Sequence, residues 1–421
     1  MNIYFSGIGG AGIGPLAEIA VDAGYSVAGS DPAETLMTKQ LIQKGITIDT
    51  VQDGTFLITH HHDKPIDWFI YSSALPDDNP ELEMARKLGI KTAKRDELLA
   101  YIIDDKNLKL IAIAGTHGKT TTTGMLIWAM QQLGIPISYS IGTTIKFGPS
   151  GKYDPLSEYF VYECDEFDRN FLHFHPFLSL ITSVDYDHSD TYPTINDYLE
   201  AFRQFATQSN QIITWNDQHQ ELFRDLHRVK IINPSETTSN IAIVGQHNRR
   251  NATVVQAALQ LLGFDQDINN ILARFPGADR RFEKLADNLY SDYGHHPVEI
   301  AATLQHAHAL SNQIVLIYQP HQNIRQHEIR DQYTNQFELA ETIYWLPTYL
   351  SREDKDPNLP ILKPEELIQN ITNKDDIHVV DFNDELWNII QQARQAGKLV
   401  LFMGAGKIDS WLRDKLAKKS Q

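Results

Sequence analysis

The chain has 421 residues, a length that suits two to four domains of ordinary size. Its 37 Lys and Arg residues against 54 Asp and Glu residues give a net charge of −17, which argues against a nucleic-acid polymer as partner because such binders need a basic surface to displace the counterions of phosphate. The single cysteine, Cys164, excludes an intrachain disulfide and a paired-cysteine zinc site, and no apolar run approaches the roughly 18–20 residues of a membrane span.

From residue 1 the chain alternates short apolar runs with amphipathic stretches, a pattern typical of βαβ units on a parallel sheet. No basic and apolar leader precedes this pattern, so we expect a cytoplasmic protein without stable membrane insertion. Strands are expected at residues 3–6, 25–30, 46–49 and 68–73, followed by a helix over 79–88. We predict an N-terminal Rossmann-like domain over residues 1–105, with a polar linker at 104–107.

A glycine-rich turn follows the first predicted strand. Gly7-Ile8-Gly9-Gly10-Ala11-Gly12 fits the G-x-G-x-x-G pattern, and Ser30-Asp31 stands where a dinucleotide-binding fold places its ribose-binding acid. Taken alone, this pattern predicts NAD. The turn suits the diphosphate of any nucleotide, however, including a UDP-sugar, and it also suits a tight turn without ligand.

The next predicted domain covers residues 106–276, and a second glycine-rich loop lies near its start. The loop Gly115-Thr116-His117-Gly118-Lys119-Thr120-Thr121 directly follows an apolar strand expected at 108–114 and resembles a shortened P-loop. Glycines let backbone N–H groups surround phosphate oxygens, Lys119 supplies a cation to the β- and γ-phosphates, and the Thr120 hydroxyl suits Mg²⁺. A helix is expected to begin near Thr121. We therefore predict an ATP-using enzyme rather than a tight turn with an incidental lysine.

Polar clusters follow two further predicted strands of this domain. The acidic run 163–168 comes after a strand at 159–162, and a carboxylate at a strand end beside a P-loop is a common Mg²⁺ ligand. The alternative is a solvated acidic turn. His188, among acids after a strand at 178–184, is either a ligand of a second metal ion or a structural histidine. The polar segment 245–252 opens a helix with side chains able to contact a nucleobase.

The third predicted domain covers residues 277–421 and has strands at 289–292, 313–318, 342–346, 377–381 and 399–403. Alternation with helical stretches again indicates a Rossmann-like sheet. The pair Arg280-Arg281 suits neutralisation of a transferring phosphoryl group. The triple His60-His61-His62 has no supporting acid or cysteine pattern, so we expect a surface loop there rather than a metal site.

Taken together, these segments resemble the Mur ligase family over nearly the whole chain. The family's motifs GTxGKTT, ExDExD, DHxD, GxHNxxNA, RRF and DDYGHHPxE appear in order at residues 115–121, 163–168, 187–190, 245–252, 280–282 and 291–299, the last with Ser291 in place of the first acid. Within the family, the turn at 7–14, Ser72 and Ser73 with the segment 79–81, and the pair 171–172 are most similar to the branch that adds L-alanine.

The resemblance implies an α/β chain of three domains: an N-terminal Rossmann-like domain for the UDP-sugar, a central P-loop ATPase-like parallel sheet, and a C-terminal Rossmann-like domain for the amino acid. It implies that ATP phosphorylates the lactyl carboxylate of UDP-N-acetylmuramate and that the amine of L-alanine attacks the acyl phosphate, in peptidoglycan precursor synthesis. ATP and Mg²⁺ are the implied cofactors.

The resemblance also implies roles for individual residues. The ATP-binding residues would be Gly115, Thr116, His117, Gly118, Lys119, Thr120 and Thr121, with Asn248 and Asn251 at the adenine, Arg281 at the γ-phosphate and Asp292 at the ribose. Thr120, Glu163 and His188 would hold metal ions, and Lys119, Glu163, His188 and Arg281 would be catalytic. The substrate-binding residues would be Gly9, Gly10, Gly12, Ser30, Asp31, Ser72, Ser73, His321 and Arg325.

Two departures from the family bear on the assignment. No lysine occurs between Arg169 and Val229, so the carbamylated lysine of several branches is absent, as it is in the alanine-adding branch. The expected QPHRYxR-like stretch has Gln322 in place of its first arginine, and an arginine fork is the natural grip on a carboxylate. A ligase that recycles a murein tripeptide onto the same sugar nucleotide is therefore the main alternative. An NAD-dependent oxidoreductase and a non-catalytic nucleotide-binding regulator rank lower.

Overall fold

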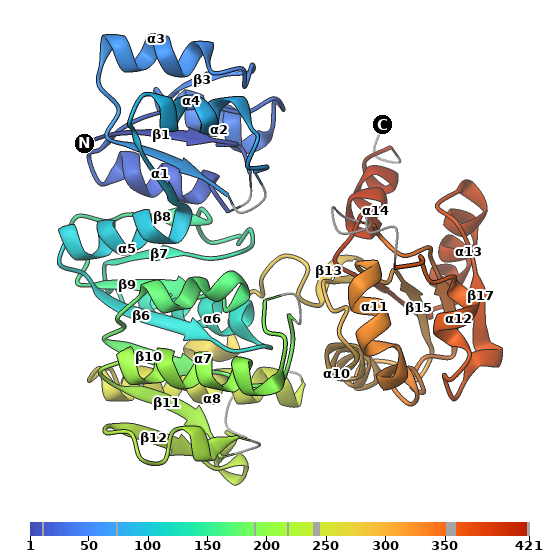
Figure 1. The fold of residues 1–421 in the computed structure, drawn as a ribbon. Coiled ribbons are helices and arrows are strands. Elements are labelled where there is room, and N and C mark those ends of the chain that lie inside the picture. Colours follow the sequence, from blue (N-terminus) through green and yellow to red (C-terminus); the bar gives the residue numbers. More distant parts are fainter. Residues whose placement is uncertain are drawn as a thin grey trace. The chain divides into compact units, whose positions relative to one another are not determined.

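A computed structural model describes residues 1–10, 12–72, 75–188, 191–216, 219–238, 245–350 and 359–418. The chain forms two compact units (Figure 1). The first holds Met1–Ala242 with Arg250–Pro276 and contains two sheets. The second holds Ile243–Arg249 with Gly277–Gln421 and contains one. The predicted fold class, three mostly parallel α/β sheets, is confirmed.

The first sheet has five parallel strands in the order β3-β2-β1-β4-β5. The strands are β1 (Asn2–Ser6), β2 (Ser26–Ser30), β3 (Thr47–Asp49), β4 (Trp68–Tyr71) and β5 (Lys91–Lys94). The helices are α1 (Gly14–Asp22), α2 (Leu36–Gln43), α3 (Thr55–Asp63), α4 (Pro80–Lys87) and α5 (Arg95–Asp105). The strand order reverses between β1 and β4, so the carboxyl ends of these strands form the switch point at which such sheets bind ligands.

The second sheet has seven strands in the order β12-β11-β10-β6-β9-β7-β8, all parallel except the β7–β8 pair. The strands are β6 (Lys109–Ala114), β7 (Ile137–Ser140), β8 (Gly151–Lys152), β9 (Tyr159–Glu163), β10 (Leu178–Ile181), β11 (Ile212–Trp215) and β12 (Val229–Ile232). The helices are α6 (Lys119–Gln132), α7 (Ile195–Gln208), α8 (Gln246–Leu261) and α9 (Ile268–Ala273). Strand β6 is central and apolar throughout its inner length because helices cover both of its faces.

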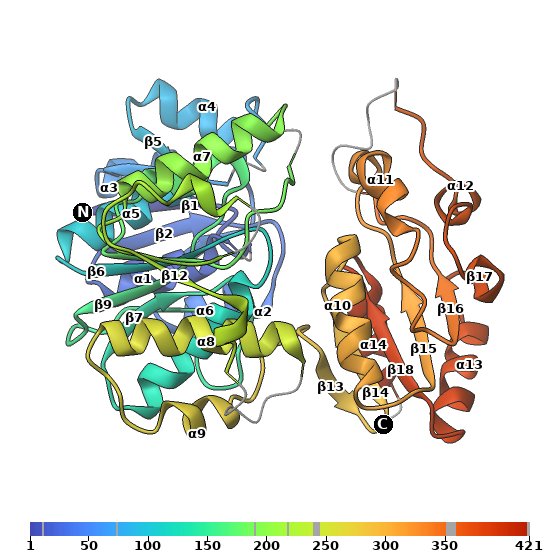
Figure 2. The same cartoon turned by 90° about the horizontal axis from the view of Figure 1, so that it is seen from below.

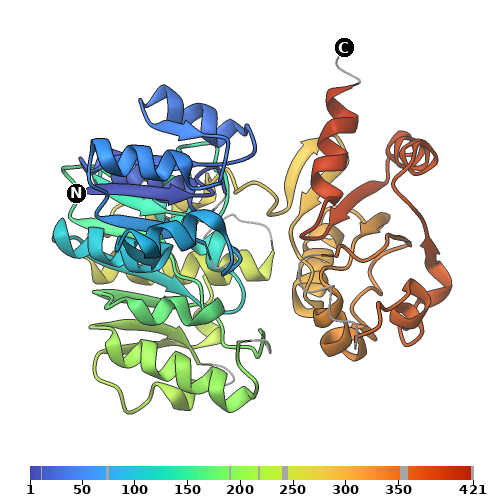
Figure 3. The ribbon, with the colours of Figure 1, turned by 45° about the horizontal axis from the view of Figure 1, so that its top comes forward.

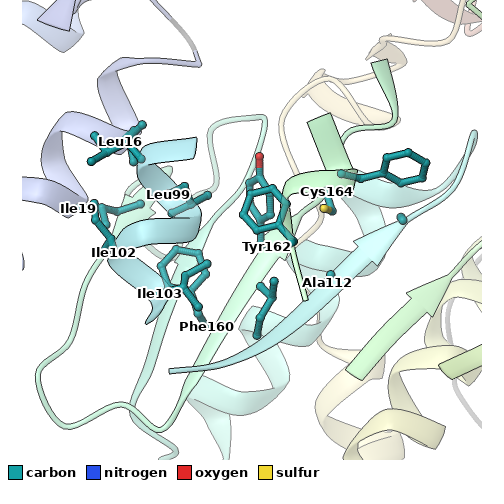
Figure 4. Close-up of a cluster of buried hydrophobic side chains, with 14 of the residues drawn as sticks. Leu16, Ile19, Leu99, Ile102, Ile103, Ala112, Phe160, Tyr162 and Cys164 are labelled. Atoms are coloured by element: carbon teal, nitrogen blue, oxygen red, sulfur yellow. The ribbon is translucent and has the colours of Figure 1, made fainter. Parts of the chain in front are cut away.

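One hydrophobic core joins the first two sheets, because helices α1 and α5 lie between them (Figures 1 and 3). Figure 4 shows Leu16 and Ile19 of α1 and Leu99 of α5 beside Phe160 and Tyr162 of β9. Burial of each such side chain contributes about 1.5–3 kcal/mol. The single thiol, Cys164, is fully buried in the same cluster, so it packs as a core residue.

The third sheet has the order β13-β14-β18-β15-β16-β17, with only the β13–β14 pair antiparallel. The strands are β13 (Glu283–Ala286), β14 (Leu289–Asp292), β15 (Ile314–Tyr318), β16 (Thr342–Trp345), β17 (Ile377–Val379) and β18 (Leu399–Met403). The helices are α10 (Pro297–His308), α11 (Asn323–Ile329), α12 (Pro364–Ile368), α13 (Asp384–Gln395) and α14 (Ile408–Ala417). Alternate residues of β15 and β18 point into two separate cores, with α10 on one face and α13 on the other (Figure 2).

Several expectations from the sequence are corrected by the structure. The expected linker at 104–107 overlaps α5, which continues to Asp105. The strand expected at 178–184 ends at Ile181. His60, His61 and His62 lie in helix α3 and not in a loop. The domain boundaries at 105/106 and 276/277 remain predictions. Among the helices that the structure describes, none is long and apolar enough to cross a membrane.

Candidate functional site

The phosphate loop connects the end of β6 to the start of α6, at the carboxyl edge of the second sheet. Gly115 and Gly118 have φ of +133° and +82°, which only glycine adopts without strain. A Cβ on Gly115 would also collide with the Thr182 hydroxyl and the Ser183 backbone. The helix begins at Lys119, two residues before the expected start, so its first N–H groups face the loop.

The loop is tied to the segment that follows β10. The Thr116 hydroxyl donates to the Asp185 carbonyl at 2.7 Å, and the His117 N–H donates to the Ser183 hydroxyl at 2.9 Å. Thr121 lies in the first turn of α6. These bonds fix the backbone of the loop against the segment that follows β10.

The Lys119 ammonium lies inside the loop. Its Nζ donates to the Gly115 carbonyl at 2.6 Å and to both carboxylate oxygens of Glu166, at 2.7 and 2.9 Å. Burial lowers the pKa of Lys119, but the charges of Glu166, Asp165 and Glu163 and the hydrogen bonds to Glu166 together outweigh it and raise the net pKa. The ammonium is therefore charged and held inside the loop, and its contact with the β- and γ-phosphates stays a prediction.

Two further predicted residues meet beside the loop. The Thr120 hydroxyl donates to Glu163 Oε1 at 2.5 Å, and the Gly142 N–H donates to Glu163 Oε2 at 2.7 Å. Glu163 is the last residue of β9, and β9 pairs with β6, so Glu163 lies beside the end of β6 that leads into the loop. His188 is near the same loop, with Nε2 3.4 Å from Glu166 Oε1 and a φ of +60°. The structure therefore brings Lys119, Thr120, Glu163 and His188 into one neighbourhood.

The central residue of this neighbourhood, Glu166, was not among the predicted site residues. Its side chain is 1% exposed and links Lys119 to His188. The acidic run 163–168 was recognised in the sequence, but nothing in it marks which carboxylate turns inward. Burial would raise the pKa of Glu166, yet the Lys119 and His188 charges outweigh it and lower the net pKa, so the carboxylate is ionised.

The oxygen atoms of Thr120 and Glu163 suit Mg²⁺, which in nucleotide sites takes one or two protein oxygens and completes its shell with phosphates and water. In the parts of the chain that the structure describes, no group of three or more His, Cys, Asp or Glu side chains forms a metal site by itself. The donor set therefore fits a metal ion held jointly with a triphosphate and does not fit a closed protein cage.

Helix α8 carries the two predicted adenine contacts. Asn251 lies against the phosphate loop, since a Cβ on Gly118 would be 2.8 Å from Asn251 Oδ1. Asn248 stands one turn earlier on the same helix. The adenine role of both side chains remains a prediction.

The first glycine turn is held by the end of β2. The N–H groups of Gly7 and Ile8 donate to the Ser30 carbonyl at 2.8 and 3.0 Å, and the Gly9 N–H donates to Asp31 Oδ2 at 2.8 Å. The Gly10 N–H closes the turn on the Gly7 carbonyl at 3.0 Å.

The remaining residues predicted at this turn lie close by or outside the described residues. Gly12 faces the Arg95 guanidinium so closely that a Cβ would collide with it. Ser72 follows β4 across the switch point and is half-buried. Ser73 lies outside the described residues.

In the second unit, the predicted acceptor residues gather after β14 and β15. Arg325 Nη1 is hydrogen-bonded to His295 Nε2, and the His295 ring packs edge-on against His321 with centroids 5.4 Å apart. His321 also stacks on Tyr349 at 5.5 Å. His295 and Tyr349 were not predicted as site residues, although His295 belongs to the DYGHHP segment.

Arg281 precedes β13, and Asp292 is the last residue of β14 in the same sheet. The Arg281 guanidinium is 5.2 Å from the centre of the Tyr293 ring. Asp292 is buried and accepts N–H groups from Phe282 and Gly294, each at 2.7 Å. Burial raises the pKa of Asp292. This geometry braces the loop that presents Arg281; the ribose contact of Asp292 stays a prediction.

We expect the His321 ring to be neutral throughout pH 5–8. Burial, with the nearby His295, Arg325 and Arg280 charges, lowers the pKa of His321 to about 3. Ring ¹⁵N NMR at pH 5.5 should show the neutral imidazole pattern, whereas free histidine, with an ordinary pKa of about 6.5, is mostly charged. Because the unfolded chain then binds the extra proton, this site favours unfolding as the pH falls below about 6.5. An imidazolium pattern for His321 would contradict this.

Sequence profiles of one family match the chain in three consecutive segments. "Mur ligase family, catalytic domain" matches residues 2–107, "Mur ligase middle domain" matches 113–232, and "Mur ligase, glutamate ligase domain" matches 280–406. A curated relative, UDP-N-acetylmuramate–L-alanine ligase of Carboxydothermus hydrogenoformans, is 31% identical over 97% of this chain and 95% of its own length.

Solved structures show the same fold. The UDP-N-acetylmuramate–alanine ligase of Thermotoga maritima is similar with a TM-score of 0.77 and 24% identity, covering 100% of both chains. A murein peptide ligase of Psychrobacter arcticus has a TM-score of 0.66 and 23% identity, covering 99% of this chain and 98% of its own. The three-domain architecture is thus shared with both.

Proposed function

The chain belongs to the Mur ligase family of ATP-dependent ligases, and we propose that it joins L-alanine to the lactyl carboxylate of UDP-N-acetylmuramate, in the cytoplasm, as a step of peptidoglycan precursor synthesis. The observation that carries the proposal is the phosphate loop with Lys119 buried against Glu166, beside Thr120 and Glu163. A regulator without catalysis would not need this arrangement. An NAD-dependent oxidoreductase would leave the loop without a purpose.

The chemistry requires activation because a carboxylate is a poor electrophile. A lactyl carboxylate oxygen attacks the γ-phosphorus of ATP, ADP leaves, and an acyl phosphate forms. The neutral amine of alanine then attacks the carbonyl carbon, giving a tetrahedral intermediate that collapses to the amide and inorganic phosphate, and the proton lost by the nitrogen leaves on the phosphate. The protein contributes positioning and charge neutralisation. Lys119 stabilises the negative charge that shifts from the γ-phosphate to ADP.

The metal assignment is part of the proposal. Thr120 and Glu163 would hold one Mg²⁺ at the triphosphate, and His188 would help to hold a second ion. Bound Mg²⁺ would supply Lewis-acid stabilisation of phosphate charge. Glu166 keeps Lys119 and His188 in place, a role that does not require direct contact with ATP.

The acceptor site is proposed to lie at His321 and Arg325, with His295 fixing the Arg325 guanidinium. An arginine binds a carboxylate by paired charge-assisted hydrogen bonds. Because glutamine replaces the arginine expected at position 322, one carboxylate contact of the alanine-adding pattern has to come from another group.

The test is acceptor-dependent ADP release by the purified protein with ATP, Mg²⁺ and UDP-N-acetylmuramate. We expect turnover with L-alanine that exceeds turnover with other amino acids and with the tripeptide L-alanyl-γ-D-glutamyl-meso-diaminopimelate. A preference for the tripeptide would assign the recycling reaction instead. No acceptor-dependent turnover with any of them would remove the ligase proposal.

A further inference from the structure

A fully buried carboxylate, that of Glu81, lies near the carboxyl ends of the strands of the first sheet. Glu81 is the second residue of α4, whose cap Asn79 accepts the Glu81 N–H at 2.9 Å. Three hydroxyls donate to this carboxylate: Tyr4 to Oε1 at 2.7 Å, and Ser6 and Ser30 to Oε2, each at 2.6 Å. A buried carboxylate is tolerated when its oxygens are satisfied in this way and when a helix N-terminus faces it.

The hydrogen-bond network extends from Ser6 and Ser30 to Gln52, in the segment that follows β3. Gln52 Nε2 lies 3.2 Å from Ser6 Oγ and 3.1 Å from Ser30 Oγ. An amide nitrogen has two N–H groups, so Gln52 donates one to each serine while each serine donates its own proton to Glu81. Glu81, which follows β4, therefore contacts the ends of β1 and β2 directly, and Gln52, which follows β3, joins the network through the two serines. These are the strand ends at which a doubly wound sheet binds its ligand.

Ser30 connects this network to the first glycine turn. Its hydroxyl is held by Glu81, and its carbonyl accepts the N–H groups of Gly7 and Ile8. Gly7 has a φ of +72°, so the turn depends on this support from β2. Glu81 thus acts on the turn through Ser30.

We propose that Glu81 is a positioning residue for the sugar-nucleotide site: its buried carboxylate holds Ser30, and through Ser30 the first amides of the Gly7–Gly12 turn, in the conformation that receives a nucleotide diphosphate. The inference rests on the proposed function, which places the UDP-sugar at this turn. A carboxylate is required because three hydroxyl protons need acceptors. The single oxygen of a glutamine amide accepts two of them and leaves the third without a partner.

The test uses the full chain and calorimetric binding of UDP, UDP-N-acetylmuramate and a non-hydrolysable ATP analogue. Glu81→Leu, which removes both carboxylate oxygens, is expected to raise the Kd of both uridine nucleotides about tenfold, the effect of losing one well-formed hydrogen-bond link. Affinity for the ATP analogue should stay within twofold, and KM for the UDP-sugar should rise more than kcat falls. A general loss of stability would weaken the binding of the ATP analogue as well, so weaker binding confined to the uridine nucleotides excludes it.

Two matched variants locate the effect. Tyr4→Phe removes the donor on Oε1, which does not lead to the turn, and should change UDP affinity less than twofold. Ser30→Ala removes the link on Oε2 and should weaken UDP binding as Glu81→Leu does. The Glu81→Leu, Ser30→Ala double variant should then bind UDP no more weakly than the weaker-binding single variant, because both changes act through one hydrogen bond. Should Glu81→Leu fail to fold, Ser30→Ala against Tyr4→Phe makes the same comparison.

The outcomes separate the two proposals. If the unaltered protein binds UDP and Glu81→Leu or Ser30→Ala binds it equally well, the positioning role is wrong and the proposed function stands. Equal weakening by Tyr4→Phe would also overturn the role, because it would show a general structural effect. If the unaltered protein does not bind either uridine nucleotide, the proposed function itself fails.

Discussion

Replacing Lys119 with alanine is expected to lower kcat/KM by about 10²–10³-fold while UDP-N-acetylmuramate still binds. The ammonium is held by the Gly115 carbonyl and Glu166 at the start of α6, and alanine puts no cation in its place. The first glycine turn belongs to a different sheet and makes its own backbone contacts. Steady-state ADP release measures the first effect, and calorimetry with the UDP-sugar measures the second.

Lys109→Ala is the matched control for this variant. Lys109 begins β6, the strand that ends at the phosphate loop, and its ammonium pairs with Glu158 on the surface at 2.5 Å. An exposed ion pair contributes little, so activity should stay within about twofold of the unaltered protein. Equal loss of sugar-nucleotide binding and turnover in Lys119→Ala would show that the two nucleotide sites are not separate.

Replacing Glu166 with glutamine is expected to lower the free energy of unfolding by about 3–5 kcal/mol and to remove most of the turnover. The change leaves the Lys119 ammonium, whose side chain is 15% exposed, without its nearest counter-ion, since the carboxylate lies 2.7 Å from it and is 1% exposed. It also removes the negative charge that faces His188 at 3.4 Å. Urea unfolding measures the stability, and ADP release measures the activity.

A double variant separates these two effects. In Lys119→Met combined with Glu166→Gln, neither buried charge remains, so much of the stability lost in Glu166→Gln should return. Turnover should not return, because the cation at the β- and γ-phosphates is missing. If the single Glu166→Gln variant were as stable as the unaltered protein, the buried ion pair would not exist in solution.

The ion pair also has a defined pH dependence. The pKa of Glu166 is lowered in the folded state, so its contribution is present above the unfolded value of about 4.3 and is lost as the pH falls through the folded pKa. The pKa of Lys119 is raised, so its contribution is complete below about pH 10.4 and is lost as the pH rises through the folded pKa. Glu166→Gln should therefore flatten the acid limb of the stability profile.

The strands that the sequence predicted well are buried ones. β6 and β18 are covered on both faces, so nearly every residue in them is apolar and the run is visible without any partner. The overlooked strands include edge or short segments, such as β8 (Gly151–Lys152) and β12 (Val229–Ile232). Pairing on one side defines such strands, and their own side chains carry little signal.

The sequence by itself determined the two glycine turns, the phosphate-loop lysine and the fold class, because these depend on local spacing: a strand, a few glycines and the start of a helix. Only the tertiary structure decided the roles within the acidic run 163–168. Its four carboxylates go to four different partners: Glu163 to Thr120, Asp165 to Arg95, Glu166 to Lys119 and Asp168 to Lys94. Positive φ at Asp168 and Arg169 turns the chain sharply there. Which carboxylate is buried against the lysine therefore depends on where the strands and helices around it place their cations, and neighbouring acids of the same kind carry no local mark of that choice.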